Sequence, residues 1–282
     1  MGWRGLRSIC SGRTIVPLVQ GAESAKDAYD CYSASYDETN AQNNYEMWLG
    51  EALLPELERH GLRRGWALDV GCGTGRAFDP LLSRGWRVVG CDLSPGMLAE
   101  ATYKFGPRIS LLNLDGRDLP PICPSPGLPR EQAFQLVLLL NDVVNYMTED
   151  GDLERAFAGV RRNLSPKQGL VVFDINTIAL FRAAFASGVS KEMSARGLRW
   201  RGLSNEVKPG MVCRAQLSGP SIEPHEHRQR HWTVQQVTEA LDASGLSCRA
   251  ILGQKEQEGR ILLSDRLDEE RDHKIIFLAG RK

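Results

Sequence analysis

The chain has 282 residues, 42% of them hydrophobic, with 35 Lys and Arg against 35 Asp and Glu. This length suits one large α/β domain with an added segment, or two smaller domains. The balanced charge disfavours a protein that acts on nucleic acid, because such domains usually have a basic face. The longest apolar run, residues 136–140, is far shorter than the roughly 20 residues of a membrane helix, so we expect a soluble protein without membrane contact.

The first 22 residues contain three arginines and no acidic residue. We therefore predict that residues 1–25 are a leader, which could be a transit peptide, a disordered segment or the product of an early start codon. The seven cysteines are scattered, form no C-x-x-C pair and follow no signal-peptide apolar region. Reduced thiols in the cytoplasm are the simplest interpretation.

Residues 43–60 have apolar side chains four apart, which predicts a helix that Gly50 and Pro55 could kink or break. From residue 67 onward, strands and helices alternate, which indicates a doubly wound, mostly parallel sheet. The predicted strands are residues 67–70, 87–92, 109–112, 135–140 and 170–175, and the predicted helices are 76–84, 95–104 and 152–164.

The alternation stops after the fifth strand. Residues 198–232 predict a small antiparallel insertion, with a hairpin around 208–210 and a strand over 225–231. The core pattern then resumes with a capped helix from Thr233 to Ala243 and strands near 248–252 and 274–279. We interpret residues 255–272, which are strongly charged, as an exposed loop. The expected core is thus a seven-stranded sheet with the insertion before its sixth strand.

A glycine-rich turn follows the first strand, in the sequence Asp69-Val-Gly-Cys-Gly-Thr-Gly75. Glycine is needed where a backbone approaches a ligand closely or adopts positive φ. The spacing G-x-G-x-G differs from the G-x-G-x-x-G of dinucleotide-binding proteins. A phosphate-binding Walker loop is also excluded, because no Gly-Lys-Ser/Thr follows.

Acidic residues end the next two strands. Asp92 lies about 20 residues after the glycine loop, where a carboxylate can accept hydrogen bonds from both hydroxyls of a ribose. Leu93 and Met97 would offer apolar surface to an adenine ring. Asp115 ends the third strand, in a position to accept a hydrogen bond from an adenine amino group.

These segments resemble class I S-adenosylmethionine-dependent methyltransferases, in the motifs at residues 69–75, 92–95 and 115–120. The resemblance covers roughly residues 30–280. It implies a Rossmann-like fold, S-adenosyl-L-methionine as cofactor and S-adenosyl-L-homocysteine as product. The cofactor-binding residues that it implies are Tyr36, Asp69, Gly71, Cys72, Gly73, Gly75, Asp92, Leu93, Met97, Asp115, Gly116 and Asn141.

The resemblance also implies a division of the chain. Residues 26–64 would form a helical cap over the cofactor, and residues 65–178 the cofactor-binding core. Residues 179–232 would form an insertion on the acceptor side, and residues 233–282 would complete the core sheet. We expect a monomer or a homodimer.

The segment after the fourth strand, Asn141-Asp-Val-Val-Asn-Tyr146, lacks the Asn/Asp-Pro-Pro-Tyr/Phe motif of methyltransferases that act on nucleic-acid bases. Together with residues 33–37 and 173–177, it is similar to methyltransferases of natural-product and amino-sugar biosynthesis. An amine acceptor needs only to be neutral, whereas a hydroxyl usually needs a base. The candidates beside the expected methyl position are Asp142, Asn145 and Tyr146, of which Asp142 and Tyr146 are the candidate catalytic residues. The alternatives are a capping role for Asp142 and core packing for Tyr146.

His225, His227 and His231 share one face of the predicted strand, because alternate residues point the same way. We favour solvated or hydrogen-bonded surface positions for them. A substrate contact or base is the second interpretation, with His227 as the catalytic candidate, and a metal site is the third. No fourth ligand is suggested nearby, so no metal is expected.

The favoured function is an enzyme that methylates nitrogen, or alternatively oxygen, of a small biosynthetic molecule, such as an antibiotic precursor. Two alternatives stay open: a methyltransferase of RNA or protein, and a cofactor-binding subunit that lacks catalysis and supports a partner.

Overall fold

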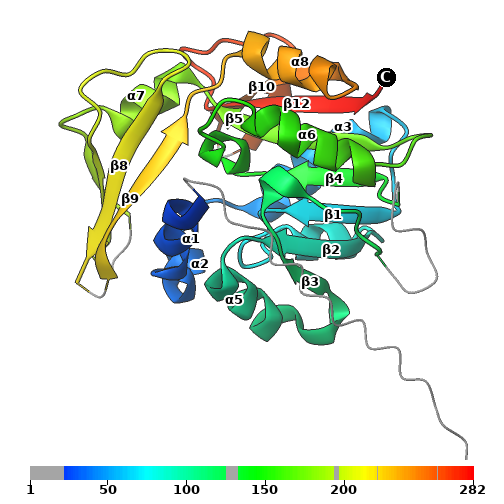
Figure 1. The fold of residues 1–282 in the computed structure, drawn as a ribbon, viewed down its shortest axis with the longest axis horizontal. Helices are drawn as coiled ribbons and strands as arrows, with labels where there is room; N and C mark the ends of the chain where they lie inside the picture. Colours follow the sequence, from blue (N-terminus) through cyan, green and yellow to red (C-terminus); the bar gives the residue numbers. More distant parts are fainter. Residues whose placement is uncertain (1–21, 125–132, 194–196, 221, 259) are drawn as a thin grey trace, which may run out of the picture.

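The computed structural model describes residues 22–124, 133–193, 197–220, 222–258 and 260–282. Most of the predicted leader, residues 1–21, therefore lies outside the described residues. An eight-stranded sheet forms the centre of the molecule, in the order β11-β10-β12-β5-β4-β1-β2-β3 (Figure 1). A separate four-stranded sheet, in the order β6-β7-β8-β9, lies beside it. The predicted α/β class is confirmed.

Five strands of the central sheet are parallel, as the alternation of strands and helices predicts. Leu68 on β1 is paired with both Val89 and Val137, so β1 lies inside the sheet with its neighbours in register. All four residues of β4 are buried, as expected for a strand covered on both faces. The bounds are β1 Trp66–Val70, β2 Arg87–Asp92, β3 Ser110–Asn113, β4 Leu136–Leu139 and β5 Leu170–Asn176.

Helices cover both faces of this sheet. One face packs on α6 and α8 through apolar side chains such as Phe157 and Leu241. The other face packs on η2, α3, α4 and α5, through residues that include Leu53 and Phe78. The bounds are η2 Glu46–Leu53, α3 Leu54–Arg59, α4 Phe78–Leu82, α5 Pro95–Phe105, α6 Asp152–Asn163 and α8 Val234–Ala243.

The helix predicted over residues 43–60 is confirmed over residues 46–59, where it changes from π to α type without a break. Its first part, η2, is a π-helix that continues directly into α3, and Pro55 occupies the first turn of α3. Proline has no amide to donate, and the π-helix before it already departs from the α-helical bonding that a proline would interrupt. Gly61, just past the end, has a φ of 81°, as expected for a helix C-terminal glycine.

The sheet has one strand more than predicted. Residues 255–272 were expected to form an exposed loop, and this prediction is wrong for their first part. The strand β10 (Leu246–Gln257) pairs with β11 (Arg260–Ser264) and with the last strand β12 (Lys274–Arg281), in both cases antiparallel. The charged residues around the turn resemble a loop, whereas Ile261 and Leu263 of β11 pack on the core.

The predicted antiparallel insertion is confirmed. Its strands are β6 Ser190–Glu192, β7 Arg199–Gly202, β8 Val212–Gly219 and β9 Ile222–Arg230. The helix α7 (Ile178–Phe185) packs on it through Phe181 and Phe185. Two buried amides join β9 to the core: Asn145 donates to the Arg230 carbonyl over 2.9 Å, and Asn176 donates to Gln229 over 3.3 Å.

The N-terminal helices lie between the two sheets (Figure 1). The helix α1 (Ala22–Asp30) contacts β9 on one side and α5 on the other. Short turns follow, η1 Ser33–Ser35 and α2 Tyr36–Thr39. The Asp30 carboxylate accepts hydrogen bonds from the Ser94 hydroxyl and, over 2.8 Å, from the Gly96 amide at the start of α5. This contact holds α1 at the carboxyl edge of the parallel strands. Among the described residues, none of the helices is both long enough and apolar enough to span a membrane.

Candidate functional site

The glycine loop connects β1 to the following helical turn in a conformation that its glycines require. Gly71, Gly73 and Gly75 have φ values of 70°, 53° and 81°, in the left-handed region that favours glycine. A Cβ on Gly73 would meet no atom within 4 Å, so this residue keeps open space beside the backbone. A Cβ on Gly75 would lie 2.6 Å from the Phe78 ring, so this glycine permits close packing.

This loop forms one wall of a cavity, which we call the inner cavity. Its empty space, together with the open solvent at its mouth, is about 950 Å³. All of the predicted cofactor-binding residues line it except Asp69 and Gly75. The positions at successive strand ends, which the sequence singles out separately, are thus brought together.

Asp92, at the end of β2, orients the loop. One carboxylate oxygen accepts a hydrogen bond from the Gly73 amide, and the other accepts one from the Ser94 amide, each over 2.8 Å. Burial raises the pKa of Asp92, although these backbone hydrogen bonds oppose the shift. The same carboxylate that faces the cavity therefore also fixes the backbone that cradles a ligand.

Asp69 lies on β1 below the loop, outside the cavity lining. The residue is 3% exposed. Burial, followed by the charge of Asp92, raises the pKa of Asp69 to about 8. Whether it contacts a cofactor stays a prediction, as it does for Gly75.

Asp115, at the third strand end, already has a partner in the protein. Its carboxylate accepts hydrogen bonds from the Arg117 side chain, at 3.0 Å from Nε and 2.7 Å from Nη2. Arg117 itself is 4% exposed and lines the inner cavity. Arg117 has no role predicted from the sequence, although it stands within the Asp-Gly-Arg-Asp motif.

A second cavity, which we call the outer cavity, lies between the N-terminal segment, the insertion and the hairpin β10–β11. It encloses about 1680 Å³ up to its mouth. Aromatic side chains and amides dominate its lining, with Trp48, Trp200, Asn44, Gln229 and Gln254 as examples. The segments that build it are distant in the sequence.

The two cavities share five lining residues, which we call the junction: Tyr29, Tyr36, Tyr45, Asn141 and Tyr146. Three of the rings touch one another; the Tyr29 centroid lies 5.4 Å from Tyr146 and 6.1 Å from Tyr36. The Asn141 amide donates to the Tyr36 hydroxyl over 3.3 Å. A group that passes from one cavity to the other would pass between these side chains.

The turn after β4 is strained and held by a buried acid. Asn141 and Asp142 both have positive φ, 63° and 75°, which is unfavourable for residues with a Cβ. Their amides donate to the two carboxylate oxygens of Asp174, over 2.6 and 3.0 Å. Asp174 is fully buried on β5 and can accept both bonds because it stands beside this turn.

Lys274 on β12 completes this arrangement. Its ammonium group lies 2.9 Å from Asp174 and also pairs with Asp142. Burial lowers the pKa of Lys274, but the two carboxylates outweigh that effect and raise it above its ordinary range. Asp142, a candidate base, is thus engaged in an ion pair and is not a free carboxylate.

The other two catalytic candidates contact each other. The Tyr146 hydroxyl lies 2.7 Å from Nδ1 of His227, and no protein atom among the described residues bonds the buried Nε2 of that ring. Burial lowers the pKa of His227 to about 4, so its imidazole is neutral near pH 7. Burial also raises the pKa of Tyr146, which therefore keeps its proton.

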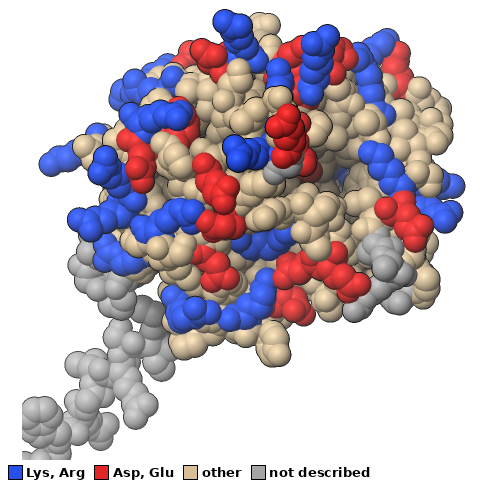
Figure 2. Space-filling view, turned by 180° about the vertical axis from the view of Figure 1, so that it is seen from behind, with Lys and Arg blue, Asp and Glu red and all other residues tan. Residues whose placement is uncertain are grey.

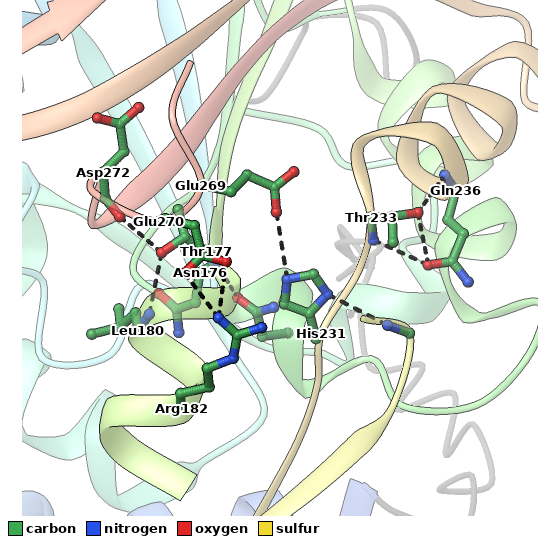
Figure 3. Close-up of polar contacts among 12 residues, drawn as sticks. Asn176, Thr177, Leu180, Arg182, His231, Thr233, Gln236, Glu269, Glu270 and Asp272 are labelled. Atoms are coloured by element: carbon green, nitrogen blue, oxygen red, sulfur yellow. Dashed lines mark hydrogen bonds and ion pairs between the residues drawn. The ribbon is translucent and has the colours of Figure 1, made fainter. Parts of the chain in front are cut away.

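The three histidines of the insertion do not share one environment. His227 and His231 are 1% and 0% exposed, so the favoured interpretation as surface residues is wrong for both. In Figure 3 His231 faces Glu269, whose carboxylate lies 3.8 Å from Nε2. Burial lowers the pKa of His231 to about 4. Within the described ranges, no three His, Cys, Asp or Glu side chains gather in a way that could hold a metal ion.

Tyr29, Arg117 and Lys274 are site residues that were not predicted from the sequence. Arg117 could have been found as a basic residue between the acids of one motif. Lys274 is the first residue of the last strand, and its register opposite Asn176 places it beside β5. Only the pairing of β12 with β5 brings Lys274 to this site, and that pairing is not visible in the sequence.

Comparisons with known proteins agree with this geometry. Residues 67–167 match a family model described as a methyltransferase domain. The chain is 32% identical over 151 residues to a protein of Bacillus subtilis (strain 168) named "Putative methyltransferase YqeM". This match covers 53% of the chain and 56% of that relative, so the chain spans little more than half the length of the relative. The predicted resemblance to S-adenosylmethionine-dependent methyltransferases is thus confirmed, with the family match over residues 67–167.

Two solved structures show the same fold. One is an S-adenosylmethionine-dependent methyltransferase from Clostridium acetobutylicum, with a TM-score of 0.68 and 19% identity over 90% of this chain and 98% of that chain. The other is the sugar N-methyltransferase KedS8 from a Streptoalloteichus species, with a TM-score of 0.60 and 18% identity over the full length of both chains. At these identities the likeness establishes the fold.

Proposed function

We propose that this chain, a methyltransferase that uses S-adenosylmethionine, binds that cofactor in the inner cavity and methylates an amine of a small molecule in the outer cavity. The observation that carries this proposal is the junction, where Tyr29, Tyr36, Asn141 and Tyr146 line both cavities. A methyl group has to move only from one side of this ring of side chains to the other.

The inner cavity fits the cofactor in its shape and chemistry. The open space beside Gly73 suits the methionine chain, and Asp92 offers its carboxylate to the ribose hydroxyls. Leu93, Met97 and Leu114 line the part near Asp115, which suits a flat apolar ring with an amino donor. Aromatic rings at the junction suit a sulfonium cation, because the faces of such rings attract positive charge.

The state of the candidate bases favours nitrogen over oxygen. A hydroxyl acceptor has to lose a proton during the reaction, whereas a neutral amine attacks with its lone pair. Asp142 is paired with Lys274, Tyr146 retains its proton, and His227 is a weak base with a pKa near 4. None of the three is well suited to activate a hydroxyl.

The outer cavity suits a polar acceptor of modest size. Amides such as Asn176 and Gln254 can bond hydroxyl groups, and Trp200 can pack on the face of a saturated ring. The name of KedS8, a sugar N-methyltransferase, supports an amino sugar or a related natural product as the acceptor. Figure 2 shows Lys and Arg interspersed with Asp and Glu over one face, a distribution that gives no support to a nucleic-acid partner on that face.

The protein's part in the reaction is to bind and align. S-adenosylmethionine supplies an electrophilic methyl group; the acceptor nitrogen forms a bond to it as the carbon–sulfur bond breaks, and the nitrogen then releases a proton to water. The junction holds the two partners in line, and such alignment is the main source of acceleration in a reaction of this type. Tyr29 and Tyr36 of the N-terminal segment line both cavities, so this segment would lie against the bound cofactor and the acceptor.

The test is methyl transfer from S-adenosylmethionine with a labelled methyl group. The substrates are amino sugars, each paired with the corresponding sugar that has a hydroxyl in place of the amine, together with tRNA and a protein extract. We expect label on amino sugars and none on their hydroxyl partners. Label on the hydroxyl partners, or only on tRNA or protein, would overturn the proposal.

A further inference from the structure

Arg117 is a buried cation in the wall of the inner cavity whose role the proposed reaction does not explain. It follows β3 in the short helix η4 (Gly116–Asp118), and its side chain is 5% exposed. A buried arginine is costly unless its charge is paired and its donors are bonded. Two acids meet it, one on each side: Asp115 at the cavity and Asp152 behind it, at 3.9 Å.

The hydrogen bonds from Arg117 occupy most of the acceptor positions of the Asp115 carboxylate. Oδ1 accepts from the backbone amide and from Nε of Arg117, both over 3.0 Å. Oδ2 accepts from Nη2 over 2.7 Å, with a longer contact of 3.2 Å to Nε. These contacts come from three N–H donors, because the Nε proton is shared between the two oxygens. A carboxylate offers about four acceptor positions, so about one is left for a ligand.

The guanidinium also fixes the direction of that remaining position. Its planar fork holds both oxygens of Asp115 at once, which a single point charge cannot do. Arg117 is itself held from behind by Asp152, a fully buried residue at the start of α6 that also pairs with Arg155. The carboxylate therefore presents a fixed acceptor to the cavity.

We propose that Arg117 is a specificity-determining residue, which sets Asp115 to accept one hydrogen bond from the exocyclic amino group of adenine and thereby selects adenine over hypoxanthine. The inference rests on the cofactor site proposed above. Hypoxanthine has a carbonyl oxygen in place of the amino group, and this oxygen would face the carboxylate oxygen without a proton between them. A site that is built to bond a donor rejects an analogue that lacks it.

The test compares two ligands that need no acceptor and no turnover: S-adenosylhomocysteine and S-inosylhomocysteine, each titrated by calorimetry. We expect the wild-type protein to bind the adenine ligand at least about a hundredfold more tightly, since a site built around a donor strongly rejects a ligand that lacks it. Arg117→Met and Arg117→Lys should each lower this preference at least about tenfold, because the acceptor is then free to turn. Arg117→Lys keeps the charge and serves if Arg117→Met does not fold.

The matched control is Arg155→Met. Arg155 shares the Asp152 partner but is 41% exposed and makes no contact with Asp115, so its removal should leave the preference unchanged. Equal weakening of both ligands by the Arg117 variants would show a merely structural role and overturn the proposal. A wild-type protein that binds both ligands equally would also overturn it. Failure of the wild-type protein to bind S-adenosylhomocysteine would instead reject the proposed cofactor site.

Discussion

The inner and outer cavities are built in different ways. The inner cavity is formed by the ends of consecutive parallel strands, so that Gly71, Asp92 and Asp115 recur at regular points of the sequence. The outer cavity combines Tyr32 from the N-terminal segment, Trp200 from the insertion and Gln254 from the edge hairpin. The inner cavity follows from the order of the parallel strands along the chain. The outer cavity depends on how segments that are distant in the sequence pack together. Changes in each should therefore have different consequences.

Lys274 joins the two regions, and its loss should have the largest effect. Lys274→Met leaves Asp174, which is fully buried, and Asp142 without their cation. Breaking a buried ion pair in this way costs about 3–5 kcal/mol of unfolding free energy. Urea denaturation checks this value, with Lys282→Met as the control, because Lys282 is half exposed and its removal should change stability little.

A second substitution sharpens this prediction. The double variant Lys274→Met/Asp142→Asn carries one fewer unpaired acid and should recover part of the lost stability, because residues in one network are not additive. If Lys274→Met lowers the free energy of unfolding by less than about 1 kcal/mol, the turn at residues 141–142 does not depend on the lysine for its stability.

Asp92→Ala tests the inner cavity alone. The carboxylate bonds the Gly73 and Ser94 amides and faces the cavity, so its removal loses hydrogen bonds to a charged group. We expect S-adenosylhomocysteine to bind more weakly by about 1.5–3 kcal/mol in calorimetry. Asp79→Ala, which changes an exposed acid on α4, is the control. Unchanged affinity in Asp92→Ala would remove this residue from ligand binding.

The pH dependence of stability in the ligand-free protein should have opposite signs at Asp69, below the glycine loop, and at His231, at the end of the insertion. Asp69 has a folded pKa of about 8, above its unfolded value of about 3.9, so its contribution to stability is present at low pH and is lost as pH rises to 8. His231 has a folded pKa of about 4, below its unfolded value of about 6.5. Its contribution is present above pH 6.5 and is lost as pH falls to 4.

Two variants separate these contributions. Between pH 5 and 8, Asp69→Asn should gain stability relative to wild type by up to about 1.4 kcal/mol per pH unit. As pH falls from 6.5 to 4, the stability of His231→Gln relative to wild type should rise, also by up to about 1.4 kcal/mol per pH unit. Urea denaturation at several pH values measures both. Parallel curves for wild type and a variant would contradict the assignment for that residue.

Tyr146→Phe should have the smallest effect and tests whether the junction moves a proton. An amine acceptor needs no base, so the rate with an amino sugar that accepts label should fall less than about tenfold. The loss of the 2.7 Å contact with His227 should be tolerated, because His227 is neutral. A fall of about 10²–10⁴, the usual contribution of acid–base catalysis, would assign the hydroxyl a part in the chemistry.

Much of the fold follows from local sequence, and the exceptions have physical causes. The bounds of β2 match the prediction, because Arg87 and Asp92 enclose an apolar run that ends at a helix cap. The hairpin β10–β11 differs from the predicted loop, because residues 255–260 are polar or glycine and mask the short apolar run of Ile261–Leu263 that pairs with β10. Pairings between distant segments, such as β12 with β5, are set by the whole fold and cannot be inferred from either strand.

The same contrast holds for the site. Most of the predicted cofactor-binding residues line the inner cavity, because their spacing follows the strand ends. The sequence could not show that Asp142 is paired with Lys274 or that His227 is buried beside Tyr146, since these contacts join segments more than 80 residues apart. The role of a residue at a strand end can be predicted from the sequence when it depends on that position alone. It cannot be predicted when it depends on a partner that is distant in the sequence.

A crystal structure of the protein with S-adenosylhomocysteine tests the central claim most directly. We predict that the ligand fills the inner cavity, with its adenine beside Asp115, its ribose at Asp92 and its sulfur at the junction facing the outer cavity. A sulfur that lies away from Tyr29, Tyr36 and Tyr146, or a ligand bound in the outer cavity, would contradict the account.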